Sequence, residues 1–274
     1  MRVETQIKIR HPLLRYFGGK FRLAPWIISH FPNHEIYVEP FGGAGSVLLQ
    51  KPQIGCEVYN DLDLDVYNLF AVLRCPDCAN LLIEQLQFTP FHREFYLEAY
   101  KDNTSNNIQK AVSLLVKSFM SFSSNGCFQK KSGFSSSTQK GKTTDATTWQ
   151  KLPENIKSIV ERLRGVIIEN LPASQIINKH DSYKTLFYLD PPYLHNTRKT
   201  KKTYKHEMTS NDHEQLLGQL NSIKGSAVIS GYDSEMYNDL LAGWEKYSTT
   251  TRAASQRGTV VKVECIWVKG ATTC

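Results

Sequence analysis

Residues 36–50 read IYVEPFGGAGSVLLQ, and this stretch decides the fold class. The apolar residues Ile36–Val38 predict a short strand, and the glycines that follow predict a tight turn. From about Ala44 onward the pattern predicts a helix. Glycine lets the backbone approach a ligand closely, and the amino-terminal end of a helix favours negative charge. The stretch therefore predicts a strand–turn–helix unit with a ligand site at its turn.

The segment that follows, CEVYNDLDLDVYNLFAVL (56–73), repeats this plan with an acidic turn between a strand and a helix. Residues 209–223, TSNDHEQLLGQLNSI, predict another helix, with Ser210 as its N-cap and Glu214 in its first turn. Strands that alternate with helices are typical of α/β folds with a mainly parallel sheet and helices on both faces. The alternating pattern near the C-terminus suits an antiparallel edge strand. Further strands are predicted at 165–168, 186–189, 227–230 and 260–268.

The alternation of predicted strands and helices is interrupted between about Cys75 and Arg164. Residues 106–122 predict an amphipathic helix, and residues 123–148 are rich in loop-forming side chains with an Asn-Gly turn signal. A surface loop is the simpler alternative, but the attached helices favour an ordered insertion. We therefore predict an inserted, mainly helical module at 75–164, between residues 1–74 and 165–274 of one larger domain.

Composition is that of an ordinary folded protein, since 41% of the 274 residues are hydrophobic and 22% are charged. The first ten residues, MRVETQIKIR, lack the apolar segment of a signal peptide. No apolar run approaches the about 20 residues that span a bilayer. We therefore expect a soluble cytoplasmic protein without a membrane partner.

The net charge of +7 favours a polyanionic partner, nucleic acid first. The cations cluster in two stretches, one Ser/Gly-rich and the other without an acid from 191 to 206. A solvated loop is the alternative for each stretch, because charge runs usually are solvated. The clusters contain Lys130, Lys131, Lys140 and Lys142, and then Arg198, Lys199, Lys201, Lys202 and Lys205.

The six cysteines are scattered and do not suggest a disulfide framework. CPDC, Cys75–Cys78, has the spacing of a zinc knuckle but lacks a second Cys or His pair at a matching interval. Two ordinary thiols at a helix start is the favoured interpretation, and we predict no metal site.

The glycine turn does not match two common nucleotide-binding motifs. A dinucleotide fingerprint that starts at Gly43 requires Gly or Ala where Leu48 stands, and a P-loop requires Gly-Lys-Ser/Thr, which is absent. A purely structural turn is the alternative. However, the next predicted strand ends in NDLD (60–63), and an acid there suits the two hydroxyls of a ribose. The two turns together predict a cofactor that contains a nucleoside.

The stretch FYLDPPYLHN (187–196) places Asp190 at the carboxyl end of a predicted strand, at the same edge as the glycine turn. The two prolines fix the backbone, so the Asp190 carboxylate and the Pro191 carbonyl are held as two acceptors. Two fixed acceptors suit one planar amino group with two hydrogens. Tyr193 adds an aromatic face on which a base can stack, although packing is the simpler role for a lone tyrosine.

DPPY (190–193), EPFGGAG (39–45) and RYFGGK (15–20), taken in this order, resemble the Dam-type, alpha-group DNA adenine-N6 methyltransferases. The likeness runs from Leu14 to about Lys269 and is weakest across the insertion. It implies a Rossmann-like methyltransferase fold, S-adenosyl-L-methionine as cofactor, and base flipping of an adenine in double-stranded DNA. The insertion at 75–164 would recognise the target. Residues 1–74 would form the cofactor-binding part of the catalytic domain and residues 165–274 its DPPY part.

The resemblance also implies roles for single residues. Tyr16 and Lys20 would contact the cofactor, with Lys20 on its carboxylate; the alternatives are a core tyrosine and a surface lysine. Asp61 would hold the ribose, whereas Asp63 and Asp65 suit a first helical turn. The segment IENL (168–171) would border the cofactor adenine. Glu39 and the glycines of the turn would bracket the methionine part, and the catalytic set would be Asp190, Pro191, Pro192 and Tyr193, the full cofactor set being Tyr16, Lys20, Glu39, Gly43, Gly45, Asp61 and Asp190.

The basic stretches would then contact DNA, the second one at phosphates near the flipped nucleotide. Residues of the first stretch would enter a groove and read bases. The predicted DNA-binding residues are Asn125, Gln129, Lys130, Lys131, Arg198, Lys199, Lys201 and Lys202.

Three alternatives to DNA adenine methylation stay open at this point. The tetrapeptide also serves methylases of RNA and of protein glutamine. A methylase homologue that only binds DNA is another alternative, and cytosine-N4 methylation uses a related tetrapeptide that usually begins with Ser. The sequence leaves open the recognition site, a cognate restriction enzyme and the oligomeric state.

Overall fold

The computed structural model describes residues 9–16, 18–101, 104–122, 132–136, 144–194, 205–255 and 258–271. The chain divides into two compact units. The first contains Met1–Pro25, Gly43–Gln53 and Asp63–Asn170, and the second contains Trp26–Gly42, Ile54–Leu62 and Leu171–Cys274.

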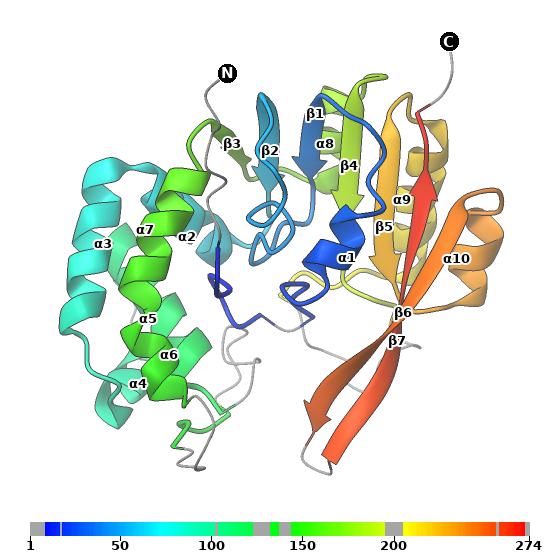
Figure 1. Ribbon diagram of the computed structural model, residues 1–274. Coiled ribbons are helices and arrows are strands. Elements are labelled where there is room, and N and C mark those ends of the chain that lie inside the picture. The colour runs from blue at the N-terminus through cyan, green and yellow to red at the C-terminus, as the bar shows by residue number, and fades with distance from the viewer. Residues whose placement is uncertain are drawn as a thin grey trace. The chain divides into compact units, whose positions relative to one another are not determined.

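A twisted mixed sheet is the centre of the second unit (Figure 1). Its strands follow the order β2-β1-β4-β5-β7-β6. Strands β2, β1, β4 and β5 run parallel, whereas β7 is antiparallel to both β5 and β6. The bounds are β1 Ile36–Glu39, β2 Cys56–Asn60, β4 Thr185–Leu189, β5 Ser226–Gly231, β6 Glu245–Ser255 and β7 Gly258–Lys269.

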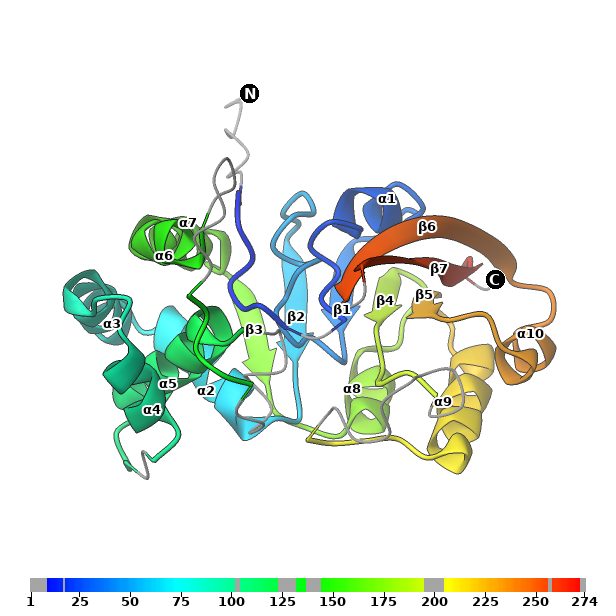
Figure 2. The same cartoon turned by 90° about the horizontal axis from the view of Figure 1, so that it is seen from below.

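Helices α8 (Ala173–His180) and α9 (Ser210–Ser222) lie on the same side of this sheet, as Figure 2 shows. Alternate strand residues face them, because side chains along a strand point to opposite faces. The apolar core on this side also includes Tyr237 of α10 (Glu235–Leu240). Fully buried members are Val38, Val58, Phe187, Leu189, Ala227, Ile229, Ile176, Ile177, Leu217 and Leu220.

The intervening strand residues build the other face of the sheet. The Phe31 ring, just beyond the short helix α1 (Ala24–Ile28), packs on Tyr37 of β1 and Tyr188 of β4 with centroids 5.8 and 5.9 Å apart. The Tyr188 hydroxyl makes a hydrogen bond of 3.0 Å to the Ser230 hydroxyl of β5. This face therefore combines aromatic packing with buried polar groups, and it leads to the carboxyl ends of the parallel strands.

The first unit is mainly helical. Helix α5 is the most buried of its helices, and α2, whose buried residues include Leu69 and Leu73, packs against it. A proline in the first turn of α3 and of α7 helps each helix to begin, because the missing N–H would have no partner there. The elements are α2 Leu64–Arg74, α3 Pro76–Phe88, α4 Arg93–Ala99, α5 Asn107–Met120, α6 Asp145–Gln150, α7 Leu152–Arg162 and β3 Val166–Glu169.

The predicted mixed, mostly parallel α/β class and all six predicted strands are confirmed, but three details are wrong. Residues 43–50 form successive turns instead of a helix, because Gly45 adopts φ +63° inside them. The N-cap of α9 is Thr209, since its hydroxyl accepts from Asp212 N. The Asp212 side chain accepts in turn from the Thr209 backbone N–H, which completes a capping box. The C-terminal strand β7 lies between β5 and β6, so it is not the edge strand.

Among the described residues, no single helix has both the length and the apolar character needed to cross a membrane. The pair α2 and α3, bent by 106° at its break, meets these criteria together by length and composition only.

Candidate active site

Three acids of the second unit stand at the carboxyl ends of neighbouring parallel strands. Glu39 ends β1, Asp61 follows β2 and Asp190 follows β4, and β1 lies between the other two strands (Figure 1). Glu39 is buried, and the other two are partly buried. In open parallel sheets ligands bind at this edge. The structure therefore brings together the three acids that the sequence predicts for the site.

The Glu39 carboxylate is held by the residue two positions before it. The Tyr37 hydroxyl donates to Glu39 Oε2 at 3.1 Å, and both side chains lie on the same face of β1. Burial first, and then the negative charge of Glu39, raise the pKa of Tyr37 well above its ordinary value. The hydroxyl therefore stays protonated and remains a donor to the carboxylate.

Asn60, the last residue of β2, joins two loops at this edge. Its Nδ2 donates to the carbonyls of Pro40 and Leu171, and its Oδ1 accepts from Leu171 N, each at 2.9 Å. Its own carbonyl accepts from Gly42 N at 2.8 Å. These bonds fix the start of the glycine turn beside Asp61. Asn60 is not among the site residues predicted from the sequence, although a polar residue that ends an apolar strand is a signal.

Gly42 has no room for a side chain. A Cβ built there would lie 2.1 Å from Cε2 of Tyr59, a ring that is fully buried on β2. The backbone of the turn therefore passes directly over that ring. Such a close approach is what the glycines of the sequence predict.

The DPPY segment is well packed in the second unit. Pro191 and Tyr193 are buried, and Pro192 is partly exposed. The Tyr193 hydroxyl donates to Glu264 Oε2 of β7 at 2.7 Å, and its ring meets the Tyr232 ring edge-on at 4.6 Å. Neither Glu264 nor Tyr232 is among the site residues predicted from the sequence. An acid inside the apolar strand pattern of β7 was the available signal for Glu264.

The other predicted cofactor residues belong to the first unit. Tyr16 lies against the glycine turn, because a Cβ on Gly43 would be 3.3 Å from Tyr16 Cε1. Gly43 and Gly45 have φ values of +49° and +63°, which L-residues with side chains rarely adopt. Lys20 is only 4% exposed, and its Nζ donates to the Gly18 carbonyl at 2.8 Å. The alternative of a solvated surface lysine is therefore wrong.

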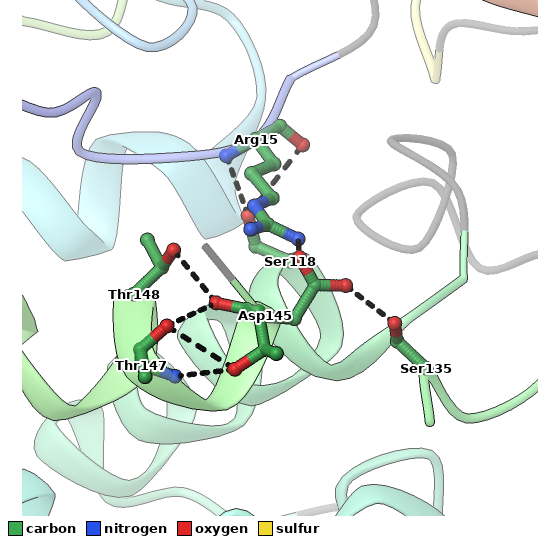
Figure 3. Close-up of polar contacts among 7 residues, drawn as sticks. Arg15, Ser118, Ser135, Asp145, Thr147 and Thr148 are labelled. Carbon is green, nitrogen blue, oxygen red and sulfur yellow. Dashed lines mark hydrogen bonds and ion pairs between the residues drawn. The ribbon is translucent and has the colours of Figure 1, made fainter. Parts of the chain in front are cut away.

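Arg15, next to Tyr16, ties this segment to two helices of the first unit (Figure 3). Its backbone N–H donates to the Ser118 hydroxyl of α5 at 2.7 Å, and its guanidinium pairs with Asp145 of α6 at 2.5 Å. The other Asp145 oxygen accepts from the Ser135 hydroxyl. Asp145 thereby links the residue before Tyr16 to residues 132–136, which lie in the predicted recognition region.

Several remaining predictions have definite outcomes. Asp63 is the N-cap of α2 and accepts from Asp65 N at 2.9 Å, so both are helix-start acids as predicted. Cys75 is the N-cap of α3, and Cys78 lies in its first turn, both as free thiols. The predicted DNA-binding residues Asn125, Gln129, Lys130, Lys131, Arg198, Lys199, Lys201 and Lys202 lie outside the described residues.

Residues 16–255 match the model of the family described as D12 class N6 adenine-specific DNA methyltransferase. The chain is 39% identical over 69 residues to a DNA adenine methylase of Haemophilus influenzae, which is 24% of each protein. It is 30% identical over 132 residues to a DNA adenine methylase of Vibrio cholerae, 47% of each. A Serratia marcescens DNA adenine methylase matches at 27% over 116 residues, 40% of this chain and 42% of that protein.

The chain thus spans about half or less of the length of these relatives. Among solved structures, the rRNA methyltransferase aviRa from Streptomyces viridochromogenes aligns with a TM-score of 0.42 and 13% identity, over 98% of this chain and 93% of that one. The family match is the decisive comparison, because it contains Tyr16, the glycine turn and the DPPY segment within one continuous span. The chain belongs to the family of D12 class N6 adenine-specific DNA methyltransferases.

Proposed function

We propose that the protein transfers a methyl group from S-adenosylmethionine to the N6 amino group of adenine in double-stranded DNA, at a specific site. The observation that carries the proposal is the coincidence of the family match with three acids at one sheet edge. Glu39, Asp61 and Asp190 occupy the positions at which an α/β sheet binds a nucleoside-containing ligand.

The residues at hand suit this cofactor. At Gly42 the turn presents only backbone to the sheet edge where the ligand would bind. The Tyr59 ring fills the space that a side chain on Gly42 would need. Asp61 can accept from ribose hydroxyls, and a buried ammonium such as that of Lys20 suits a carboxylate. When bound, the cofactor supplies an electrophilic methyl group on a sulfonium sulfur. The sulfonium charge is compatible with the acids Glu39 and Asp190.

Asp190 and the Pro191 carbonyl would hold the adenine amino group. Its nitrogen is a poor nucleophile because the lone pair is delocalised into the ring. Two acceptors that draw on the two N–H bonds favour a tetrahedral nitrogen with a localised lone pair. Catalysis is then mainly positioning, with the nitrogen about 3–3.5 Å from the methyl carbon and aligned for displacement. The proton leaves after transfer, so no strong base is required.

Inside a duplex this amino group is out of reach, so the adenine must be flipped out. Tyr193 directly follows the two prolines and is the aromatic side chain best placed in sequence to stack on it. The cations of 198–205 would neutralise phosphates beside the flipped nucleotide.

The test is a substrate panel with radiolabelled cofactor and purified protein. We expect label in N6-methyladenine of duplex DNA and in neither RNA nor protein. Transfer to RNA or to a protein amide would refute the proposal, and so would a lack of cofactor binding by calorimetry, which favours a DNA-binding homologue. Methylome sequencing of a host that expresses the protein gives the target base and the recognition sequence together.

A further inference from the structure

Glu264 is the one acid of strand β7, and it lies 71 positions from the residue that it binds. Its Oε2 accepts from the Tyr193 hydroxyl at 2.7 Å. Tyr193 is 7% exposed and Glu264 is 9% exposed, and both belong to the second unit. A buried carboxylate is costly unless it accepts strong hydrogen bonds. The burial of this acid therefore needs an explanation beyond strand packing.

The sheet register brings Glu264 to Tyr193. Strand β7 pairs antiparallel with β5 through Ser230 and Ile266. Glu264 lies two residues before Ile266, so it faces the same side of the sheet as Ser230. That is also the side of Glu39, and it is opposite the side covered by α8 and α9. The carboxylate thus lies near the carboxyl end of β5, one strand from the end of β4.

Neighbouring side chains restrict the Tyr193 ring further. The Tyr232 ring, just after β5, meets it edge-on at 80° with centroids 4.6 Å apart. Lys262, two residues before Glu264, donates from Nζ to the Tyr232 hydroxyl at 2.7 Å and lies 4.9 Å from that ring's centroid. Tyr193 is therefore held at its hydroxyl by one β7 side chain and at its ring by a tyrosine that another β7 side chain holds.

We propose that Glu264 is a positioning residue, whose carboxylate fixes the ring plane of Tyr193 so that the extruded adenine stacks in register with Asp190. This inference rests on the proposed function, in which Tyr193 is the stacking platform. The hydroxyl oxygen lies on the axis of the second torsion of the tyrosine side chain, so the charge-assisted hydrogen bond fixes the first torsion. Because a phenol O–H prefers the ring plane, the direction of this bond and the edge-on Tyr232 ring together restrict the second torsion, which sets the ring plane. The direction of the bond is stable in neutral solution, because burial and the charges of Asp190 and Glu264 raise the pKa of Tyr193 well above its ordinary value.

Four variants test the inference on duplex DNA with radiolabelled cofactor. Glu264→Ala removes the acceptor, and Tyr193→Phe removes the donor but keeps the ring. Each should lower kcat about 10- to 100-fold, since a small misplacement of the substrate can cost about 100-fold. The KM for S-adenosylmethionine should stay within about threefold, because neither change reaches a predicted cofactor contact. Glu264→Gln keeps an acceptor oxygen and should restore kcat to within about threefold.

The fourth variant combines Tyr193→Phe with Glu264→Ala. If one bond carries both effects, the double variant is no slower than either single variant. Losses in kcat that multiply would overturn the inference. So would Tyr193→Phe with normal kcat, and this result does not depend on whether Glu264→Ala folds. A merely structural role predicts lower thermal stability with kcat unchanged in the folded fraction, which also contradicts positioning.

The chain offers a matched control in the same unit. The Tyr247 hydroxyl donates to Glu245 Oε2 at 2.5 Å on β6, and Tyr247 is 37% exposed. Glu245→Ala removes the same kind of bond from the surface and should leave kcat unchanged. If the wild-type protein methylates no adenine, the proposed function itself fails. If the wild type is active and every variant is normal, only the positioning role of Glu264 fails.

Discussion

Asp190 is the side chain whose role depends most directly on its charge. Asp190→Asn keeps the size but turns one acceptor into an N–H₂ group that faces the adenine amino group. We expect the single-turnover rate of methyl transfer to fall by at least about 100- to 1,000-fold, as when a preorganised electrostatic contact is removed. The thermal midpoint should change little, because Asp190 is only partly buried.

Glu35→Gln is the control for this variant. Glu35 directly precedes β1, so it lies at the amino ends of the parallel strands, whereas Asp190 lies at their carboxyl ends. Its carboxylate accepts from Lys184 Nζ at 2.9 Å, with the two side chains 68% and 64% exposed. Exposed pairs contribute about 0–1 kcal/mol, so rate and stability should stay normal. A normal rate for Asp190→Asn would remove Asp190 from the chemistry.

Gly43 connects the backbone of the glycine turn to Tyr16. In Gly43→Ala the new Cβ would lie 3.3 Å from the Tyr16 ring. The alanine would also have to adopt the φ near +49° that Gly43 has. We expect about 1–2 kcal/mol lower stability from the left-handed backbone. We also expect the Kd for S-adenosylmethionine to rise at least about fivefold, equivalent to about 1 kcal/mol, because the ring must shift. Denaturant unfolding and calorimetry measure the two effects.

Gly243→Ala is the control that separates the effect of backbone strain on stability from the effect of the Tyr16 contact on cofactor binding. Gly243 has φ +94°, and a Cβ there meets no atom within 4 Å. Its stability should fall by a similar amount while the cofactor Kd stays unchanged. Equal Kd values for both variants would exclude Tyr16 and the turn from the cofactor site.

Single residues differ in how far the sequence predicts them. Glu39, Asp61 and Asp190 were predictable, because acids at the ends of neighbouring parallel strands must meet at one edge. For Glu264 and Asn60 the sequence carries a local signal, but their partners were not predictable. The contact of Glu264 with Tyr193 depends on the register of β7 on β5, and the bonds of Asn60 depend on where Leu171 returns to the sheet. Neither is encoded in local sequence spacing.

At the scale of elements, the attachment of the Tyr16 segment to α6 makes a testable link. Asp145→Asn removes the charge that pairs with Arg15, a pair with side chains 28% and 27% exposed. We expect a loss of about 1–2 kcal/mol in the free energy of unfolding. Faster amide exchange of residues 13–20 should accompany it, with a weaker Kd for S-adenosylmethionine, because that segment loses its tie to the helix.

Glu154→Gln is matched to this change. Glu154 is in the first turn of α7, as Asp145 is in the first turn of α6, so both variants lose the same interaction with a helix dipole. Its partner Lys157 is three residues away, and both side chains are more than half exposed. If Glu154→Gln changed exchange at 13–20 as much as Asp145→Asn, the tie through Arg15 would be refuted.

Among the elements, the strands were easier to predict than the segment after β1. Short apolar runs between turn signals identify buried strands well, as at β4 and β5. The segment from Ala44 has helix-forming residues, but Gly45 at positive φ interrupts it. Because a Cβ on Gly45 would lie 2.9 Å from the Phe70 ring, tertiary packing overrides local propensity there.

At the scale of the whole molecule, the alternation of strands and helices predicted the mixed sheet. It did not predict how the chain divides into two compact units. The first unit collects Met1–Pro25 with Gly43–Gln53 and the helical region, because buried contacts such as Arg162 to the Leu48 carbonyl join distant segments. Such contacts leave no periodic mark in the sequence. The predicted boundaries of the insertion at 75–164 therefore stay a prediction.

The charge of the whole molecule leads to a last prediction, on the salt dependence of DNA binding. The net charge is +7, and Arg198, Lys199 and Lys201 follow the catalytic segment. Each phosphate neutralised by a cation contributes a slope of about 0.9 to the fall of log K with log salt. Replacement of these three residues by Gln should therefore lower the slope by about 2 to 3, as measured by fluorescence anisotropy between low and moderate salt.

A charge-matched triple variant makes the result interpretable. Lys179, Lys184 and Lys224 are exposed. Lys184 directly precedes β4 and Lys224 lies two residues before β5, at the ends opposite the acids. Their replacement by Gln removes the same three charges from the molecule. If long-range attraction to net charge governed binding, both triples would lower the slope equally. If phosphates lie beside the catalytic segment, only the first triple does so, and equal slopes would refute direct phosphate contact by 198–201.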